Sequence, residues 1–138
     1  MKVHVLDANA LYRLLTRGPG FAIVNRLLKD ARDAQQPVRM SVVNWGEVYY
    51  SIARHEGFAQ TALIMDRVKL LPVAILEAEE TVTAKAAQLK AGYGLPYADC
   101  FAAATAGNDA ILVTSDLKDF RKIPNLQILP LPERTTRN

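Results

Sequence analysis

The sequence has little cysteine and no long apolar segment. Its 138 residues include one cysteine, Cys100, so neither an internal disulfide nor a four-thiolate zinc site can form. The longest uncharged run is residues 123–132, which contains three prolines, whereas a membrane-spanning helix needs about 20 apolar residues. Asp7 interrupts the stretch that would form the apolar region of a signal peptide. We therefore expect a cytoplasmic protein with no membrane association.

The composition is that of one folded domain. Half of the residues are hydrophobic and 22% are charged, which excludes a disordered chain. A chain of this length buries about two-thirds of its unfolded surface. The net charge of +3 permits a polyanionic partner but does not require one. We expect a single domain over residues 1–132 and a polar, flexible tail over residues 133–138.

Short apolar segments alternate with amphipathic ones along the chain. Strands are predicted at residues 2–7, 37–43, 71–76, 110–114 and 125–129. Helices are predicted at residues 9–16, 21–33, 44–54, 58–69, 78–90 and 97–106, with a break at Gly57. The strands show no polar–apolar alternation, which is typical of strands covered on both faces. The pattern predicts a three-layer α/β sandwich around a parallel sheet of about five strands.

Acidic side chains follow several of the predicted strands. Ligand sites of open parallel sheets lie beyond the carboxyl ends of the strands. The acids near those ends are Asp7, Glu47, Asp99, Asp116 and Asp119. Each has a structural alternative: a helix cap, a capping box from Asn44 to Glu47, or a favourable interaction with a helix dipole.

If these acids converge, their mutual repulsion must be relieved by protons or by a cation. A ligand set made only of carboxylate oxygens favours Mg²⁺ or Mn²⁺ over zinc. A divalent ion in such a site supports the hydrolysis of phosphodiesters. Convergence would therefore predict a metal-dependent nuclease site.

Four segments carry a family resemblance that covers nearly the whole chain. They are VLDANALYRLL (residues 5–15), SVVNWGEVYYSI (41–52), LPYADCFAAATA (95–106) and ILVTSDLKDF (111–120). In this order and at these intervals they resemble the motifs of PIN-domain ribonucleases, and within that family the VapC toxins of toxin–antitoxin pairs. Two departures are Ala8, where the family often has threonine, and the bulky Trp45 beside the second acid.

The resemblance implies a PIN-like fold and a set of site residues. The catalytic acids that bind Mg²⁺ or Mn²⁺ would be Asp7, Glu47, Asp99 and Asp116. The supporting residues would be Asn9, Thr114 and Asp119. The resemblance also implies endonucleolytic cleavage of RNA, a homodimer, and a VapB-type antitoxin that blocks the site. We hypothesise that three of the acids, Asp7, Asp99 and Asp116, hold the metal and that Glu47 positions the attacking water. Asn9 and Thr114 would hydrogen-bond the ligating carboxylates.

Basic side chains near the first and last acids are candidates for contacts with RNA phosphates. They are Arg13, Arg17, Lys118 and Arg121. The amphipathic helices predicted at residues 9–16, 21–33 and 44–54 also offer more apolar surface than one sheet covers. A dimer interface or a groove for a partner's helix would use that surface.

Other classes of protein fit the sequence less well. A receiver domain pairs two acids after its first strand, where this chain has Asp7 alone. A phosphatase of the dehalogenase type needs Asp-x-Asp there, whereas this chain has Asp7-Ala8-Asn9. A non-catalytic or housekeeping PIN-domain protein that binds RNA remains an alternative.

Overall fold

A central parallel sheet organises the chain. The structure is a computed structural model that describes residues 2–133, so of the tail predicted at residues 133–138 only Glu133 lies within the described range. The strands are β1 (His4–Leu6), β2 (Val38–Ser41), β3 (Val73–Leu76), β4 (Ile111–Thr114) and β5 (Gln127–Pro130). All neighbouring strands pair in parallel, in the order β3-β2-β1-β4-β5. The predicted α/β architecture with five parallel strands is confirmed.

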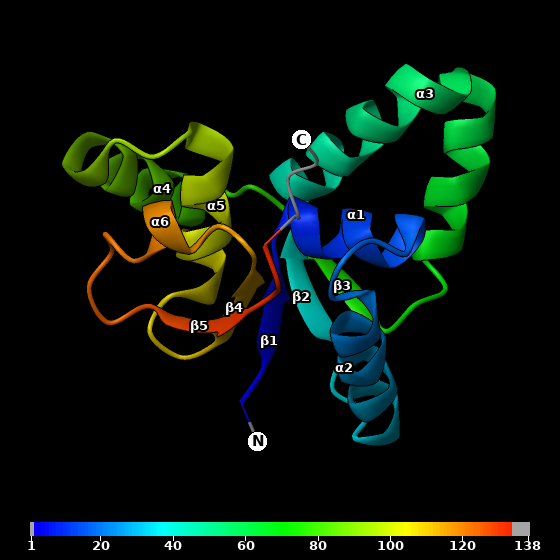
Figure 1. Ribbon diagram of the computed structural model, residues 1–138. Coiled ribbons are helices and arrows are strands. Elements are labelled where there is room, and N and C mark those ends of the chain that lie inside the picture. Colours follow the sequence, from blue (N-terminus) through cyan, green and yellow to red (C-terminus); the bar gives the residue numbers. More distant parts are fainter. Residues whose placement is uncertain (1, 134–138) are drawn as a thin grey trace.

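Helices cover both faces of this sheet (Figure 1). They are α1 (Ala8–Thr16), α2 (Phe21–Asp33), α3 (Val42–Val68), α4 (Glu80–Tyr93), α5 (Tyr97–Ala106) and α6 (Leu117–Phe120). The first three pack on one face, and α4, α5 and α6 pack on the other. The prediction lacked α6, because a helix of four residues is too short to show an apolar period.

The central strands are buried on both faces. Val5 of β1 and Leu112 of β4 pack in the core beneath α4 and α5. The next residue along each strand, Leu6 or Val113, packs in the core beneath α1 and α2. All these side chains are fully buried. This two-sided burial explains why the strands show no polar–apolar alternation in the sequence.

Helix α3 has two arms that meet at Gly57. The backbone of this glycine has φ 78° and ψ 169°, a conformation that side chains with a Cβ disfavour. The arms form a V above α1 (Figure 1), and the break predicted at Gly57 is present. The helix begins earlier than predicted, because the Ser41 hydroxyl caps it by accepting a hydrogen bond from the Val43 N–H. The alternative in which Asn44 caps this helix is therefore wrong, and Glu47 lies beyond the first turn.

The strand order reverses between β1 and β4. The chain adds β2 and β3 on one side of β1 and then places β4 and β5 on the other. In parallel sheets such a reversal opens a crevice at the carboxyl ends of the two strands. Asp7 directly follows β1 and Asp116 comes two residues after β4, so both acids lie at this crevice. Within residues 2–133, no helix is long and apolar enough to cross a membrane.

Candidate metal centre

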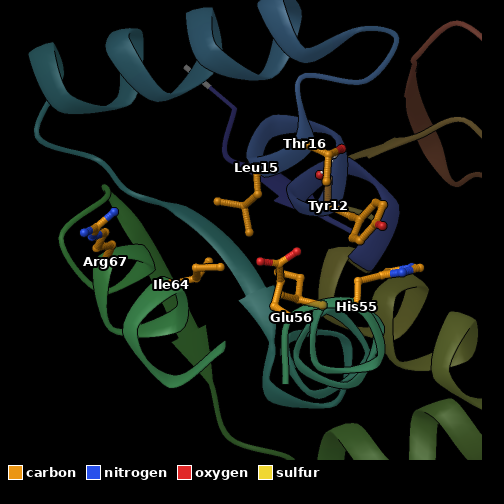
Figure 2. Close-up of a pocket in the computed structure, with 8 residues that line it drawn as sticks. Tyr12, Leu15, Thr16, His55, Glu56, Ile64 and Arg67 are labelled. Atoms are coloured by element: carbon orange, nitrogen blue, oxygen red, sulfur yellow. Dashed lines mark hydrogen bonds between the residues drawn. The ribbon is translucent and has the colours of Figure 1, made fainter. Parts of the chain in front are cut away.

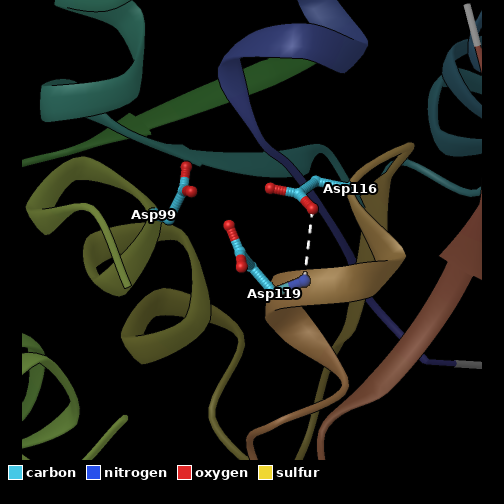
Figure 3. Close-up of side chains that lie close together, drawn as sticks. All are labelled: Asp99, Asp116 and Asp119. Carbon is cyan, nitrogen blue, oxygen red and sulfur yellow. Dashed lines mark hydrogen bonds between the residues drawn. The ribbon is translucent and has the colours of Figure 1, made fainter. Parts of the chain in front are cut away.

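Three aspartates meet at the carboxyl edge of the sheet. Asp99 comes from the first turn of α5, and Asp116 and Asp119 come from the start of α6 (Figure 3). One carboxylate oxygen of each lies within 4.8 Å of the others. Mg²⁺ binds oxygen at about 2.1 Å, so opposite ligands of one ion are about 4 Å apart. The three carboxylates therefore fit a single hard divalent cation after small side-chain adjustments.

Local hydrogen bonds place Asp116 and Asp119 relative to each other. The Asp119 N–H donates to Asp116 Oδ1 at 3.2 Å, which caps α6 (Figure 3). The Asp116 N–H in turn donates to the Thr114 hydroxyl oxygen at 3.0 Å. The cap uses one carboxylate oxygen of Asp116, and the second takes no part in that bond. Asp116 can thus start the helix and also offer an oxygen to a ligand.

Asp7 is buried beside this group of three rather than part of it. Its Oδ1 accepts a hydrogen bond from the Ala10 N–H at 2.8 Å and so caps α1. The Thr114 hydroxyl donates a further hydrogen bond to the Asp7 carboxylate. Because this hydroxyl also accepts from the Asp116 backbone, the fully buried Thr114 links the acid after β1 to the acid after β4.

Burial and the charges of neighbouring acids both act on Asp99. Burial raises the pKa of Asp99 to about 7, and the charges of Glu47, Asp7, Asp116 and Asp119 contribute in that order. The sequence hypothesis requires that acids from distant segments converge, and the structure brings three of them, Asp99, Asp116 and Asp119, within 4.8 Å of one another. A cation would relieve this repulsion.

Asp7 experiences opposing effects. Burial raises the pKa of Asp7 to about 6, although hydrogen bonds from Thr114 and the Ala10 N–H favour its charged form. The charges of Glu47 and Asp116 add to the increase. An acid with this pKa exchanges its proton for a cation near neutral pH at little cost.

Asn44 and Ser115, which the sequence did not identify as site residues, each form a hydrogen bond with a predicted site residue. Asn44 donates from Nδ2 to Glu47 Oε1 at 2.9 Å. Asn9 was expected to bond a carboxylate, but its Nδ2 donates to the Ser115 hydroxyl at 2.6 Å. Ser115 could have been suspected because it lies between Thr114 and Asp116, whereas the sequence offered only a capping role for Asn44.

The basic residues predicted to contact RNA have different environments. Arg13 is 5% exposed, and its Nη1 donates to the carbonyls of Pro19 and Pro132. It therefore ties α1 to the chain after β5, which corrects its expected role as a phosphate contact. The Arg17 guanidinium lies 6.0 Å from the centre of the Phe21 ring.

The other basic residues lie on or beside α6. Lys118 and Arg121 are exposed close to Asp116. Lys122, which was not predicted, lies 3.4 Å from Asp119 Oδ1 in a partly exposed ion pair. Such a pair contributes at most about 1 kcal/mol to stability. The Lys122 ammonium can therefore leave Asp119 and bind a phosphate instead.

A groove of about 380 Å³ separates α1 from the two arms of α3 (Figure 2). Its lining is Tyr12, Leu15, Thr16, Ile52, His55, Glu56, Ile64 and Arg67. None of the five clustered acids lines it. The groove combines apolar side chains of α1 and α3 with charged ones, and no residue of α2 lines it.

Fold and acids together define an α/β sandwich with an acidic site at its topological switch point. Residues 4–126 match the family model of the PIN domain. The chain belongs to the PIN-domain family. Among curated proteins, none matches it by sequence.

Several solved structures share the fold. VapBC2 from Rickettsia felis, bound to a DNA fragment from its promoter, is 18% identical with a TM-score of 0.76, covering 93% of this chain and 98% of that one. A DNA-bound VapBC from Salmonella typhimurium is 15% identical with a TM-score of 0.72, covering 94% and 98%. VapC20 from Mycobacterium tuberculosis, a toxin that cleaves the sarcin–ricin loop, is 16% identical with a TM-score of 0.56, covering 74% and 79%. At these identities the similarity establishes the fold.

The clustered acids predict a specific pH dependence of stability without metal. Since the pKa values of Asp7 and Asp99 are raised, the folded chain holds more protons than the unfolded chain between about pH 4 and pH 7. The free energy of unfolding attributable to these groups therefore falls as the pH rises through this window. Asp99→Asn cannot ionise, so in EDTA its melting temperature relative to wild type should be higher at pH 8 than at pH 5.

Asp109→Asn is the matched control, because Asp109 is exposed at the amino end of β4. Its melting temperature relative to wild type should be the same at both pH values. At pH 8, Mn²⁺ should raise the melting temperature of wild type and of Asp109→Asn but not that of Asp99→Asn. A difference between Asp99→Asn and wild type that does not change with pH would contradict this account of the cluster.

Proposed function

We propose that this chain is a metal-dependent endoribonuclease that acts as the toxin of a VapBC-type toxin–antitoxin pair. The observation that carries the proposal is the meeting of Asp99, Asp116 and Asp119 within 4.8 Å at the switch point. Membership of the PIN-domain family and the similarity to VapC toxins support it. RNA is the proposed substrate because the chain is mildly basic and carries cationic side chains on α6 beside the acids.

The residues divide into ligands and orienting groups. Asp99, Asp116 and Asp119 would hold Mg²⁺ or Mn²⁺, and Asp7 after β1 and Glu47 on α3 are further candidate ligands. When bound, the ion supplies positive charge that offsets the phosphate and lowers the pKa of a water nucleophile. Glu47 would orient the attacking water and accept its proton. Thr114 keeps Asp7 and Asp116 in register through its two hydrogen bonds.

The basic residues of α6 position the substrate. Lys118, Arg121 and Lys122 lie within a few residues of Asp116 in the chain, and we propose that they bind the phosphates on either side of the scissile bond. These contacts release counterions, so binding should weaken steeply with salt. Arg13 is left out of this set because it is 5% exposed and its Nη1 donates to two backbone carbonyls.

The nuclease proposal is tested with the purified chain and structured RNAs. With Mn²⁺ or Mg²⁺, wild type should cleave internal bonds, and Asp99→Asn and Asp116→Asn should each reduce the rate by about 100-fold or more, because a ligand of the charge-stabilising ion is lost. EDTA should abolish cleavage, and Asp109→Asn should cleave like wild type. Cleavage that persists in EDTA, or that both site variants retain, would overturn the proposal.

The partner we propose is a VapB-type antitoxin, which docks an amphipathic segment in the groove between α1 and α3. Similar solved structures are complexes of both proteins of such pairs. The groove combines the apolar Leu15, Ile52 and Ile64 with Glu56 and Arg67, which suits a helix with one apolar face and charges of both signs. A homodimer of this chain is also part of the proposal.

The antitoxin proposal is tested on the complex purified from the native source. Separated from a small copurifying protein, this chain should gain ribonuclease activity, and adding that protein back should remove it. Ile64→Glu should keep the activity and resist inhibition, because the charge lies in the groove. Leu63→Glu is the matched control, since Leu63 is 57% exposed and outside the groove. Equal inhibition of both variants would place the partner elsewhere.

A further inference from the structure

Asn44 connects two of the elements that carry acidic residues. It lies at the start of α3 and is 1% exposed. One hydrogen of its side-chain amide bonds the carbonyl of Ala98 at 3.0 Å, and Ala98 directly precedes Asp99 in the chain. The same nitrogen donates to Glu47 Oε1 at 2.9 Å. The amide thus joins the acid of α3 to the turn that presents the acid of α5.

The oxygen of the same amide has no partner. Among the described residues, Asn44 Oδ1 is buried and accepts no hydrogen bond. A buried acceptor without a donor destabilises a fold. Leucine has a similar volume and would remove this unpaired oxygen, but it would also take the donor away from the Ala98 carbonyl and from Glu47 Oε1. The contribution of asparagine at this position therefore lies in the two bonds made by Nδ2.

These bonds suit the control of a carboxylate that must meet a cation. The Ala98 carbonyl fixes the orientation of the amide, so that the remaining hydrogen is directed at Glu47. Because the amide is neutral, it restrains the carboxylate without cancelling its charge. A lysine or arginine in this place would form an ion pair and compete with the cation for the same oxygen. An amide donor instead leaves the charge of Glu47 available.

We propose that Asn44 is a positioning residue that holds the Glu47 carboxylate toward Asp99, so that Glu47 adds to the affinity of the acidic cluster for a divalent cation. This inference rests on the proposed function, since it concerns the same metal site. It assigns to Asn44 an effect on metal binding that passes through Glu47 and does not depend on RNA. Partners that orient metal ligands in this way typically change metal affinity by about 10–100-fold.

The test measures Mn²⁺ affinity and melting temperature on the RNA-free chain. Asn44→Leu should weaken Mn²⁺ binding by about tenfold, measured well below the melting temperature of the variant. Thr61→Val is the matched control: Thr61 is also buried on α3, and its hydroxyl bonds the Gly57 carbonyl. This control should lower the melting temperature and leave Mn²⁺ affinity unchanged.

A double-mutant cycle identifies the route of the effect. In a Glu47→Gln background, Asn44→Leu should change Mn²⁺ affinity less than about twofold, because the carboxylate through which Asn44 acts is gone. An unchanged affinity in Asn44→Leu, or the same tenfold loss in both backgrounds, would overturn the inference. A different result would contradict the proposed function itself: wild type that binds no Mn²⁺ at millimolar concentrations.

Discussion

Repulsion among carboxylates at the carboxyl edge of the sheet is the constraint on which the arrangement of this site depends. Two carboxylates about 5 Å apart repel by roughly 3 kcal/mol at an effective dielectric near 20. Here burial raises the pKa of Asp99 to about 7, and the charges of four neighbouring acids add to that increase. The acids lie close together because the ends of several elements meet at the crevice between β1 and β4. A divalent cation would convert the repulsion into binding energy.

Structural and functional roles coincide in the same side chains. Asp7 caps α1 and Asp116 caps α6, as the structural alternatives for these acids required. In each cap one oxygen of the carboxylate accepts the backbone hydrogen bond. The Thr114 hydroxyl then joins the two acids. It donates to the Asp7 carboxylate and accepts from the Asp116 backbone N–H. The caps therefore fix the acids in place as well as starting the helices.

The sequence predicted the elements of the fold well because their signals are local. The apolar runs of β1 and β4 and the positive-φ break at Gly57 need no knowledge of distant contacts. Acids at strand ends could also be located, since the topology of a parallel sheet decides where they meet. The short α6 and the early start of α3 were missed, because one is a single turn and the other depends on Ser41 acting as a cap.

The details of the site depend on contacts between distant residues, which the sequence does not reveal. Asn44 bonds a carbonyl 54 residues away, so only the folded chain shows that it serves two acids. The sequence predicts only a supporting role for Asp119, yet its carboxylate lies in the tight group with Asp99 and Asp116 because α6 turns it inward. Arg13 looked like a surface cation, and the path of the chain after β5 buries it.

Anomalous X-ray diffraction from crystals of the chain soaked in Mn²⁺ tests the central claim most directly, because it locates the ion without reference to activity. The account predicts an anomalous peak within about 2.5 Å of carboxylate oxygens of Asp99, Asp116 and Asp119. A fully soaked crystal with no peak at this edge of the sheet, or with its main peak on acids elsewhere, would contradict it.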